Sequence, residues 1–155
     1  GREAFAKAAK AAGVDGVLTV DCPPEEAAEL SAALIAAKLD PVFLIAPTTP
    51  MARVKQIAAL ARGYVYYVSL KGVTGAGNLD IDDVARKIAA LREFIDVPIG
   101  VGFGIRDAET ARAISTAADA VVVGSRLVQE IEAATPETAK EQLTRLVASL
   151  KDAIR

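Results

Sequence analysis

Short continuous apolar runs alternate along the whole chain with longer segments in which apolar residues recur three and four positions apart. The short runs are typical of buried β-strands, and the longer segments are typical of helices that bury one face. Strands are predicted at residues 16–21, 41–47, 64–69, 97–102 and 120–123. Helices are predicted at residues 2–12, 24–38, from 50 onward, 80–95, 107–117, 126–131 and from 135 to the last residues.

Several predicted helices begin at a residue suited to a helix N-terminus. Pro24 fits the first turn of its helix, because the N–H that proline lacks would have no partner there. Thr49 can cap a helix that has Pro50 at its first position, and Asp107 can cap the helix after the fourth strand. Thr135, followed by a proline, is expected to open the last helix.

The alternation of helix and strand predicts an α/β fold with a parallel sheet. The predicted strands are continuously apolar, as in parallel sheets that are covered on both faces. An open doubly wound sheet and part of a (β/α)8 TIM barrel both fit this order. The barrel is favoured because glycines gather after the last three strands, and barrel phosphate sites usually follow strands seven and eight. Residues 1–155 would then form a single domain with barrel strands 4–8, and strands 1–3 would be absent.

Composition excludes several classes of function. The net charge is −2, so no basic surface for nucleic acid is expected. No apolar run approaches the ~20 residues of a membrane helix, so no membrane segment is expected. Histidine is absent and Cys22 is the single cysteine, which argues against a metal site and a histidine-assisted nucleophile. The single cysteine fits a reducing compartment, and the expected location is cytoplasmic.

Glycines that end the last two strands suggest a phosphate site. Gly102 and Gly104 follow one apolar run, and Gly124 and Ser125 follow the next. Glycine lets a ligand approach the backbone closely because it has no Cβ. A helix that opens directly after Gly124 would direct its positive end at the same point. The alternative is that these glycines only terminate strands.

The chain resembles the tryptophan synthase alpha chain family, and five groups of residues carry the resemblance in order. They are residues 13–18 with 21–23, residues 62–66, residues 72–75, residues 102–105, and Gly124 with Ser125. The resemblance implies a (β/α)8 barrel and a lyase that cleaves indole-3-glycerol phosphate to indole and glyceraldehyde 3-phosphate. It also implies an alpha2beta2 complex with a tryptophan synthase beta chain. Pyridoxal phosphate would belong to that beta chain, and no cofactor is expected in this one.

The resemblance also assigns roles to individual positions. The residues matching the phosphate-binding positions are Gly75, Gly104, Gly124 and Ser125. Those matching the substrate pocket are Tyr66, Phe103 and Ile105, Thr74 matches the loop that closes over the substrate, and Asp21 and Pro23 match the region facing the beta chain. By period two alone, Tyr64 and Tyr66 share one face of their strand and Tyr67 lies on the other. Asp21 could instead be a general base, but a structural or interface role is favoured.

The family's catalytic carboxylates have no counterpart in this sequence. They come from the second barrel strand and the loop after it, in a motif of the Leu-Gly-Val-Pro-Phe-Ser-Asp type. No catalytic residue is therefore assigned here, and the resemblance places the catalytic carboxylates upstream of Gly1. The segment is expected to supply a phosphate anchor and a lid and to be inactive alone. Where the family often has Arg-Ser before the Gly-Val-Thr-Gly loop, this chain has Leu70 and Lys71, and Lys71 is expected to substitute in part for the arginine.

Two alternative functions remain open. One is a non-catalytic half-barrel that self-associates through its two open sheet edges. The other is another sugar-phosphate barrel enzyme, such as an epimerase or isomerase, which would share the phosphate anchor.

Overall fold

The computed structural model describes residues 1–20, 22–69, 81–102 and 104–155. Its five strands form one parallel sheet in the order β1-β2-β3-β4-β5. The strands are β1 (Gly16–Thr19), β2 (Asp40–Ile45), β3 (Val65–Val68), β4 (Ile99–Gly102) and β5 (Ala120–Val122). The helices are α1 (Arg2–Ala11), α2 (Ala28–Ala36), α3 (Met51–Leu60), α4 (Ile81–Arg92), α5 (Ala108–Ser115), α6 (Ser125–Ala133) and α7 (Ala139–Ala153).

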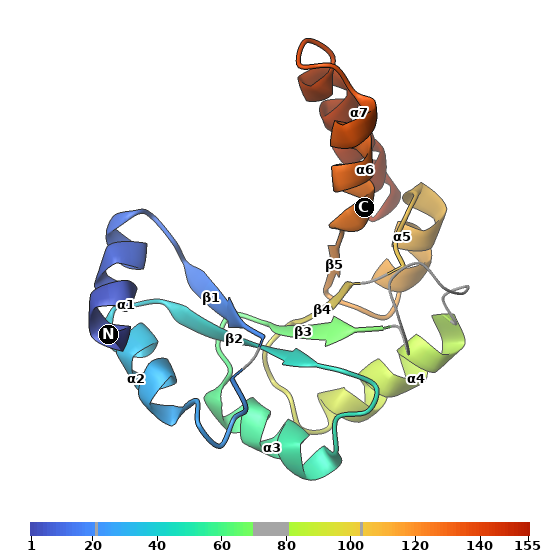
Figure 1. Cartoon of the computed structure of the whole chain (residues 1–155). Coiled ribbons are helices and arrows are strands. Elements are labelled where there is room, and N and C mark those ends of the chain that lie inside the picture. Colours follow the sequence, from blue (N-terminus) through green and yellow to red (C-terminus); the bar gives the residue numbers. More distant parts are fainter. Residues whose placement is uncertain (21, 70–80, 103) are drawn as a thin grey trace.

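The helices that join the strands follow the outer side of a curved sheet (Figure 1). A doubly wound sheet would reverse its strand order at a switch point. Here each strand pairs with the next one in the chain, as in a barrel wall. The main core lies between sheet and helices, where Val65, Ile99 and Val101 meet Val54 and Ile88. The predicted α/β fold with a parallel sheet is confirmed, and the doubly wound alternative is wrong.

The tyrosines of β3 and of the residue before it alternate between the two faces of the sheet, as period two predicts. Tyr67 is 2% exposed and belongs to the core beneath the helices. Tyr64 and Tyr66 lie on the opposite face, over Gly100 and Gly102 of the neighbouring strand. The two glycines of β4 therefore provide the space in which the tyrosine rings pack.

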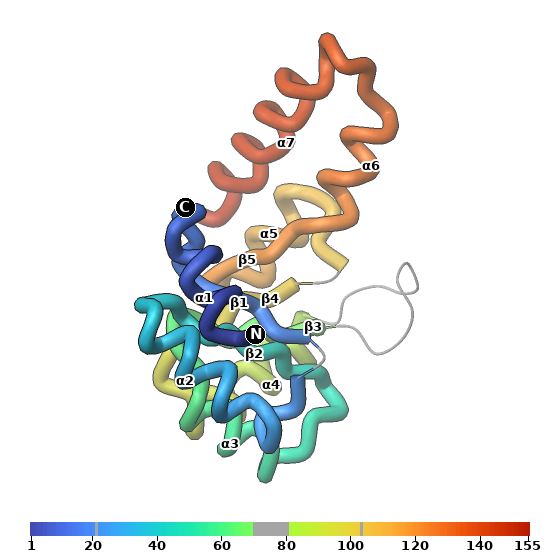
Figure 2. Tube along the Cα trace, turned by 60° about the vertical axis from the view of Figure 1, so that its left-hand side comes forward, coloured from blue at the N-terminus to red at the C-terminus, as the bar shows by residue number. Residues whose placement is uncertain are grey.

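The other face of the sheet is not covered at β1, contrary to the expectation of a sheet buried on both sides. Leu18 is 39% exposed and Val20, just beyond the strand, is 63% exposed. At the opposite end, α6 and α7 pair with each other and extend away from the sheet (Figures 1 and 2). Val128 and Ile131 of α6 are each 52% exposed. Apolar surface is thus open to solvent at both ends of the sheet.

Three predicted helix starts are wrong, and in each case a local turn takes the place of the first helical residues. Pro24 lies in a turn before α2, where its carbonyl accepts a hydrogen bond from Ala27. The Thr49 hydroxyl accepts from the N–H of Ala46 at 3.0 Å, so Pro50 is the N-cap of α3. Thr135 forms a turn with Thr138 before α7 begins.

Asp107 caps α5 as predicted. Its carboxylate accepts a hydrogen bond from the Thr110 N–H at 2.8 Å. Within the described ranges, every helix is too short or too polar to cross a bilayer.

Candidate functional site

Two glycine segments lie at the same edge of the sheet because β4 and β5 are parallel neighbours. Gly102 at the end of β4 is in register with Val122 at the end of β5. Gly104 follows β4 by two residues, and Gly124 follows β5 by two residues. The carboxyl ends of parallel strands are where α/β folds place ligands. This edge is where the sequence predicts a phosphate site, which stays a prediction.

The two glycines differ in what the fold requires of them. Gly104 has a φ of +79°, a backbone conformation that residues with a Cβ adopt only with strain. Gly124 has a φ of −122°, which any residue can adopt. An added Cβ at Gly124 would meet no heavy atom of the described chain within 4 Å. Among the described residues, no neighbour therefore requires a glycine at position 124 or fills the space before its backbone.

The N-terminus of α6 begins at this open space. The Gly124 carbonyl accepts hydrogen bonds from Leu127 at 2.9 Å and Val128 at 3.2 Å. The N–H groups of Ser125 and Arg126 precede the first intrahelical bonds, and no described side chain caps this helix. Together with the helix dipole, these amides form a positive site suited to an anion.

The neighbouring helix α5 shows the contrasting arrangement. Asp107 places its own carboxylate at the N-terminus of α5. Hydrogen bonds from Thr110 hold the pKa of Asp107 below its ordinary value, so the carboxylate stays charged. The positive end of α5 is thus neutralised within the chain, whereas no described side chain does the same at the start of α6.

A cleft of about 550 Å³ lies between the starts of α4 and α5 and is lined by Gly104. Arg106 adds a positive charge to its wall, while Asp107 and Glu109 add negative charges. Ile81 supplies an apolar part of the same wall. Gly104 therefore borders a cleft among the described residues.

The β3–β4 side of the site is held by Tyr66 and Ser69. The Tyr66 ring lies over Gly102, and burial, with the nearby Tyr64, raises the pKa of its phenol. The Ser69 hydroxyl and N–H both donate to the Gly102 carbonyl, at 2.8 Å and 3.1 Å. These contacts fix the end of the strand that leads to Gly104.

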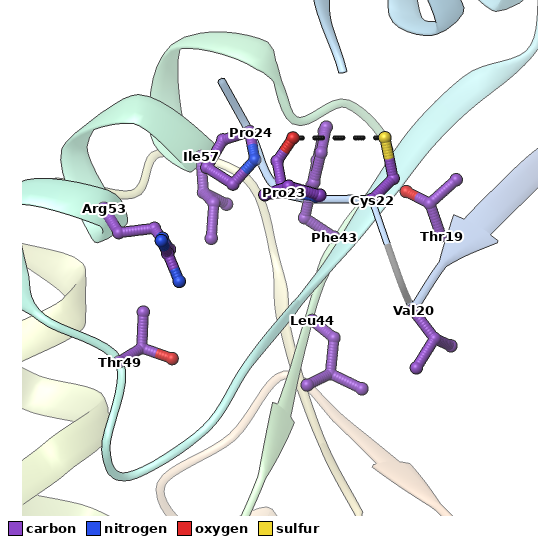
Figure 3. A pocket seen from close by; sticks show the side chains of 10 residues that line it. All are labelled: Thr19, Val20, Cys22, Pro23, Pro24, Phe43, Leu44, Thr49, Arg53 and Ile57. Carbon is purple, nitrogen blue, oxygen red and sulfur yellow. Dashed lines mark hydrogen bonds between the residues drawn. The ribbon is translucent and has the colours of Figure 1, made fainter. Parts of the chain in front are cut away.

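A second hollow, of about 320 Å³, lies where β1 and β2 end. Figure 3 shows Arg53 and Thr49 on one side of it, Thr19 and Val20 on the other, and Pro23 between them. The Arg53 guanidinium lies 3.5 Å from the Glu25 carboxylate, an exposed pair. Pro23, predicted to face a partner, thus borders a hollow that has the cationic Arg53 at its rim.

The predicted site residues fall into three groups. Gly104, Gly124 and Ser125 share one edge of the sheet. Tyr66 lies on the face of the sheet opposite the main core, whereas Ile105 is 5% exposed and packs in that core, so its role as a pocket residue stays a prediction. Apart from Pro23, which borders the second hollow, the other predicted residues lie outside the described residues; they are Asp21, Thr74, Gly75 and Phe103.

Gly1, the residue before which the catalytic carboxylates are expected, takes no part in this site. It is exposed and forms the N-cap of α1, where its carbonyl accepts a hydrogen bond from the Phe5 N–H at 3.1 Å. An added Cβ at Gly1 would meet no described heavy atom within 4 Å. Helix α1 packs on α2 beside β1, at the other end of the sheet from β5 and α6 (Figure 1). The position of the catalytic carboxylates upstream of Gly1 therefore stays a prediction from the resemblance alone.

Sequence reasoning missed Ser69 and Arg53. Ser69 looked like the last residue of a strand, and nothing in the pattern shows which carbonyl its hydroxyl reaches. Arg53 lies four residues after Thr49, which places both on one side of the helix start, but Thr49 was assigned to a cap. Among the described residues, no group of three or more Cys, Asp or Glu side chains is arranged to hold a metal ion.

Comparison with known proteins gives one consistent result. A family model described as "Tryptophan synthase alpha chain" matches residues 1–155. The chain is 82% identical over 151 residues to the tryptophan synthase alpha chain of Chromobacterium violaceum, covering 97% of this chain and 58% of that one.

Solved structures agree with the sequence comparison. A structure of Mycobacterium tuberculosis tryptophan synthase matches with a TM-score of 0.87 and 35% identity, over all of this chain and 57% of that one. The tryptophan synthase α2β2 complex of Pyrococcus furiosus matches with a TM-score of 0.82 and 36% identity, over 98% of this chain and 61% of that one. The chain thus spans a little under three fifths of the first two relatives. Its sheet is part of a TIM barrel.

Proposed function

The chain belongs to the tryptophan synthase alpha chain family, and we propose that it supplies the phosphate anchor for cleavage of indole-3-glycerol phosphate. The observation that carries this proposal is the start of α6. No described side chain caps its amides or fills the space beside Gly124, which lies at the same sheet edge as the left-handed Gly104. Ser125 adds a hydroxyl to this group of backbone donors.

The anchor contributes to catalysis by positioning. Backbone N–H groups that are already directed at the phosphate need little reorganisation when the substrate binds. Binding energy from the phosphate, remote from the bond that breaks, can hold the indole and glycerol carbons in the reactive geometry. On the neighbouring strand, Tyr66 would form part of the wall on which the indole end rests.

The cleavage itself needs groups that we do not assign to this chain. A general acid must protonate the indole ring at C3, and a base must take a proton from the glycerol hydroxyl as the carbon–carbon bond breaks. No residue of this chain is placed in those roles. The products would be indole and glyceraldehyde 3-phosphate, so the reaction is that of a lyase in tryptophan biosynthesis, which we place in the cytoplasm.

The partner in this proposal is a tryptophan synthase beta chain, which would carry the pyridoxal phosphate. The Pyrococcus furiosus relative forms an α2β2 complex, which supports an equivalent assembly here. Asp21 and Pro23 are the residues that we expect to face the beta chain. Pro23 borders the hollow at the ends of β1 and β2, where a partner side chain could enter.

Thr74 and Gly75 are proposed for the closing loop and its phosphate contact, and Phe103 and Ile105 for the pocket.

Backbone amide NMR tests the anchor directly. The ¹⁵N-labelled 155-residue chain is titrated with glycerol 3-phosphate, and with glycerol as the control. We expect saturable shifts at the amides of Gly104, Gly124 and Ser125 with the phosphate ester and none with glycerol. Equal shifts with glycerol, or shifts that spare all three residues, would overturn the proposal.

The same chain should not release indole from indole-3-glycerol phosphate. Turnover at a normal enzymatic rate would contradict the proposal that the general acid and base lie outside this chain.

A second candidate function is self-association. Leu18 and Val20 at one end, and Val128 and Ile131 at the other, leave apolar surface exposed beside two unpaired sheet edges. Two copies could cover these surfaces without any beta chain. Light scattering over a concentration series decides this: a dimer mass supports the scaffold function, and a monomer at all concentrations removes it.

A further inference from the structure

The carbonyl of Gly102 accepts two hydrogen bonds from a single residue of the neighbouring strand. The N–H of Ser69 reaches it at 3.1 Å, which continues the parallel ladder by one residue beyond β3. The hydroxyl of Ser69 reaches the same oxygen at 2.8 Å and is partly buried. A ladder needs only the first of these bonds, so the hydroxyl adds a constraint that strand pairing does not require.

Gly102 is also confined on its other sides. The Tyr66 ring occupies the space where a Cβ would project, and Val122 of β5 is its register partner. Beyond Gly102 the chain reaches Gly104 within two residues, and Gly104 needs a positive φ. A glycine turn is intrinsically free to adopt several conformations. Its direction is therefore set largely by how firmly its first residue is held.

We propose that Ser69 is a positioning residue of the phosphate anchor: its hydroxyl, by fixing the Gly102 carbonyl, directs the Gly104 amide toward the phosphate. This inference rests on the proposed function. Ser69 itself touches no phosphate; it removes conformational freedom that binding would otherwise have to remove. Preorganisation of this kind changes affinity more than it changes the stability of the fold.

Three variants test the proposal. Ser69→Ala removes the hydroxyl, and Ser69→Thr keeps it. Ser115→Ala is the matched control, because the Ser115 hydroxyl also donates to a backbone carbonyl at 2.8 Å, that of Arg112 inside α5. The affinity for glycerol 3-phosphate is measured from the amide shift at Gly124, and the urea midpoint reports stability. Ser69→Ala should weaken binding about three- to tenfold, the effect of one hydrogen bond, with a urea midpoint close to that of Ser115→Ala. Ser69→Thr and Ser115→Ala should bind as the unaltered chain does.

Two outcomes separate the inference from the proposed function. If the unaltered chain binds no glycerol 3-phosphate, the proposed anchor fails. If it binds, and Ser69→Ala binds equally well, the role of Ser69 is overturned and the anchor stands. The ¹⁵N relaxation order parameter of the Gly104 amide gives a readout that needs no ligand. It should be lower in Ser69→Ala than in Ser115→Ala, because the amide is then held less firmly, and equal order parameters would also overturn the proposal.

Discussion

The ring of Tyr66 occupies the position that a side chain on Gly102 would need. An ideal Cβ at Gly102 would lie 2.5 Å from Cε2 and 2.7 Å from Cζ of the ring, and closer still to the hydroxyl oxygen. No real Cβ tolerates such contacts. The two residues belong to paired strands and pack together on the face of the sheet opposite the main core.

Gly102→Ala should therefore destabilise the chain by about 1–3 kcal/mol, the usual cost of overpacking. The double variant with Tyr66→Leu should recover about half of that loss or more, because the smaller side chain frees the space. Urea unfolding of both single variants and the double variant measures the coupling. Gly100→Ala is the control, since its Cβ would meet the Tyr64 ring at 3.3 Å and should cost less. A double variant whose loss is the sum of the single losses would contradict this packing.

Gly124→Ala should weaken phosphate binding without lowering stability, whereas Gly16→Ala should lower stability without weakening phosphate binding. A Cβ at Gly124 enters open space, so we expect unfolding free energy to change by less than about 0.5 kcal/mol while phosphate affinity falls about tenfold. A Cβ at Gly16 would lie 3.0 Å from the Asp40 carbonyl oxygen at the other end of the sheet. This variant should lose about 1 kcal/mol of stability and bind phosphate normally. Chemical denaturation and a glycerol 3-phosphate titration measure the two effects, and unchanged binding by Gly124→Ala would remove that residue from the site.

Asp119 should make stability depend on acidity. Its carboxylate accepts from the Ile99 N–H at 2.8 Å and from Arg92 at 3.0 Å, and these bonds, the first foremost, hold its pKa below the ordinary 3.8. Because the folded pKa is the lower one, the stabilisation is complete above pH 3.8 and is lost as the pH falls through the folded pKa. Above pH 3.8 we expect Asp119→Asn to lower the free energy of unfolding by about 1 kcal/mol. The loss is this small because the pair with Arg92 is solvent-exposed.

The measurement for Asp119 is the difference in unfolding free energy between the unaltered chain and Asp119→Asn at several pH values. The difference should shrink as the pH falls below 3.8. Asp152→Asn is the control, because the Asp152–Arg155 pair is exposed and should contribute almost nothing. A difference that stays constant from neutral to acid pH would show that the charge of Asp119 has no part in stability.

The periodicity of the sequence was enough to place all five strands and to separate Tyr66 from Tyr67. Helix starts were harder, because a threonine before a proline can serve a cap or a turn equally well. The hydroxyl of Thr49 closes a turn with Ala46, and only the path of the chain decides between the two. Thr135 was assigned to a helix for the same reason, and it instead forms a turn with Thr138.

The glycines show the limit of sequence reasoning about the site. Gly102 and Gly124 look alike in the sequence, since each ends an apolar run. In the structure, Gly102 makes room for a tyrosine ring, whereas nothing in the described chain fills the space at Gly124. Packing between neighbouring strands distinguishes Gly102 from Gly124, and the local sequence pattern does not predict that packing. The contact between Ser69 and Gly102 could not be predicted from the local pattern either, because it joins residues 33 positions apart.

The central claim is that Gly104 and Gly124 direct their amides at one phosphate. Scalar couplings across hydrogen bonds, between amide ¹⁵N and ligand ³¹P, test it in the chain saturated with glycerol 3-phosphate. We predict a coupling to the same phosphorus from the Gly104 amide and from an amide within Gly124–Ser125. A saturated complex that shows coupling at only one of the two segments, or at neither, would contradict the account.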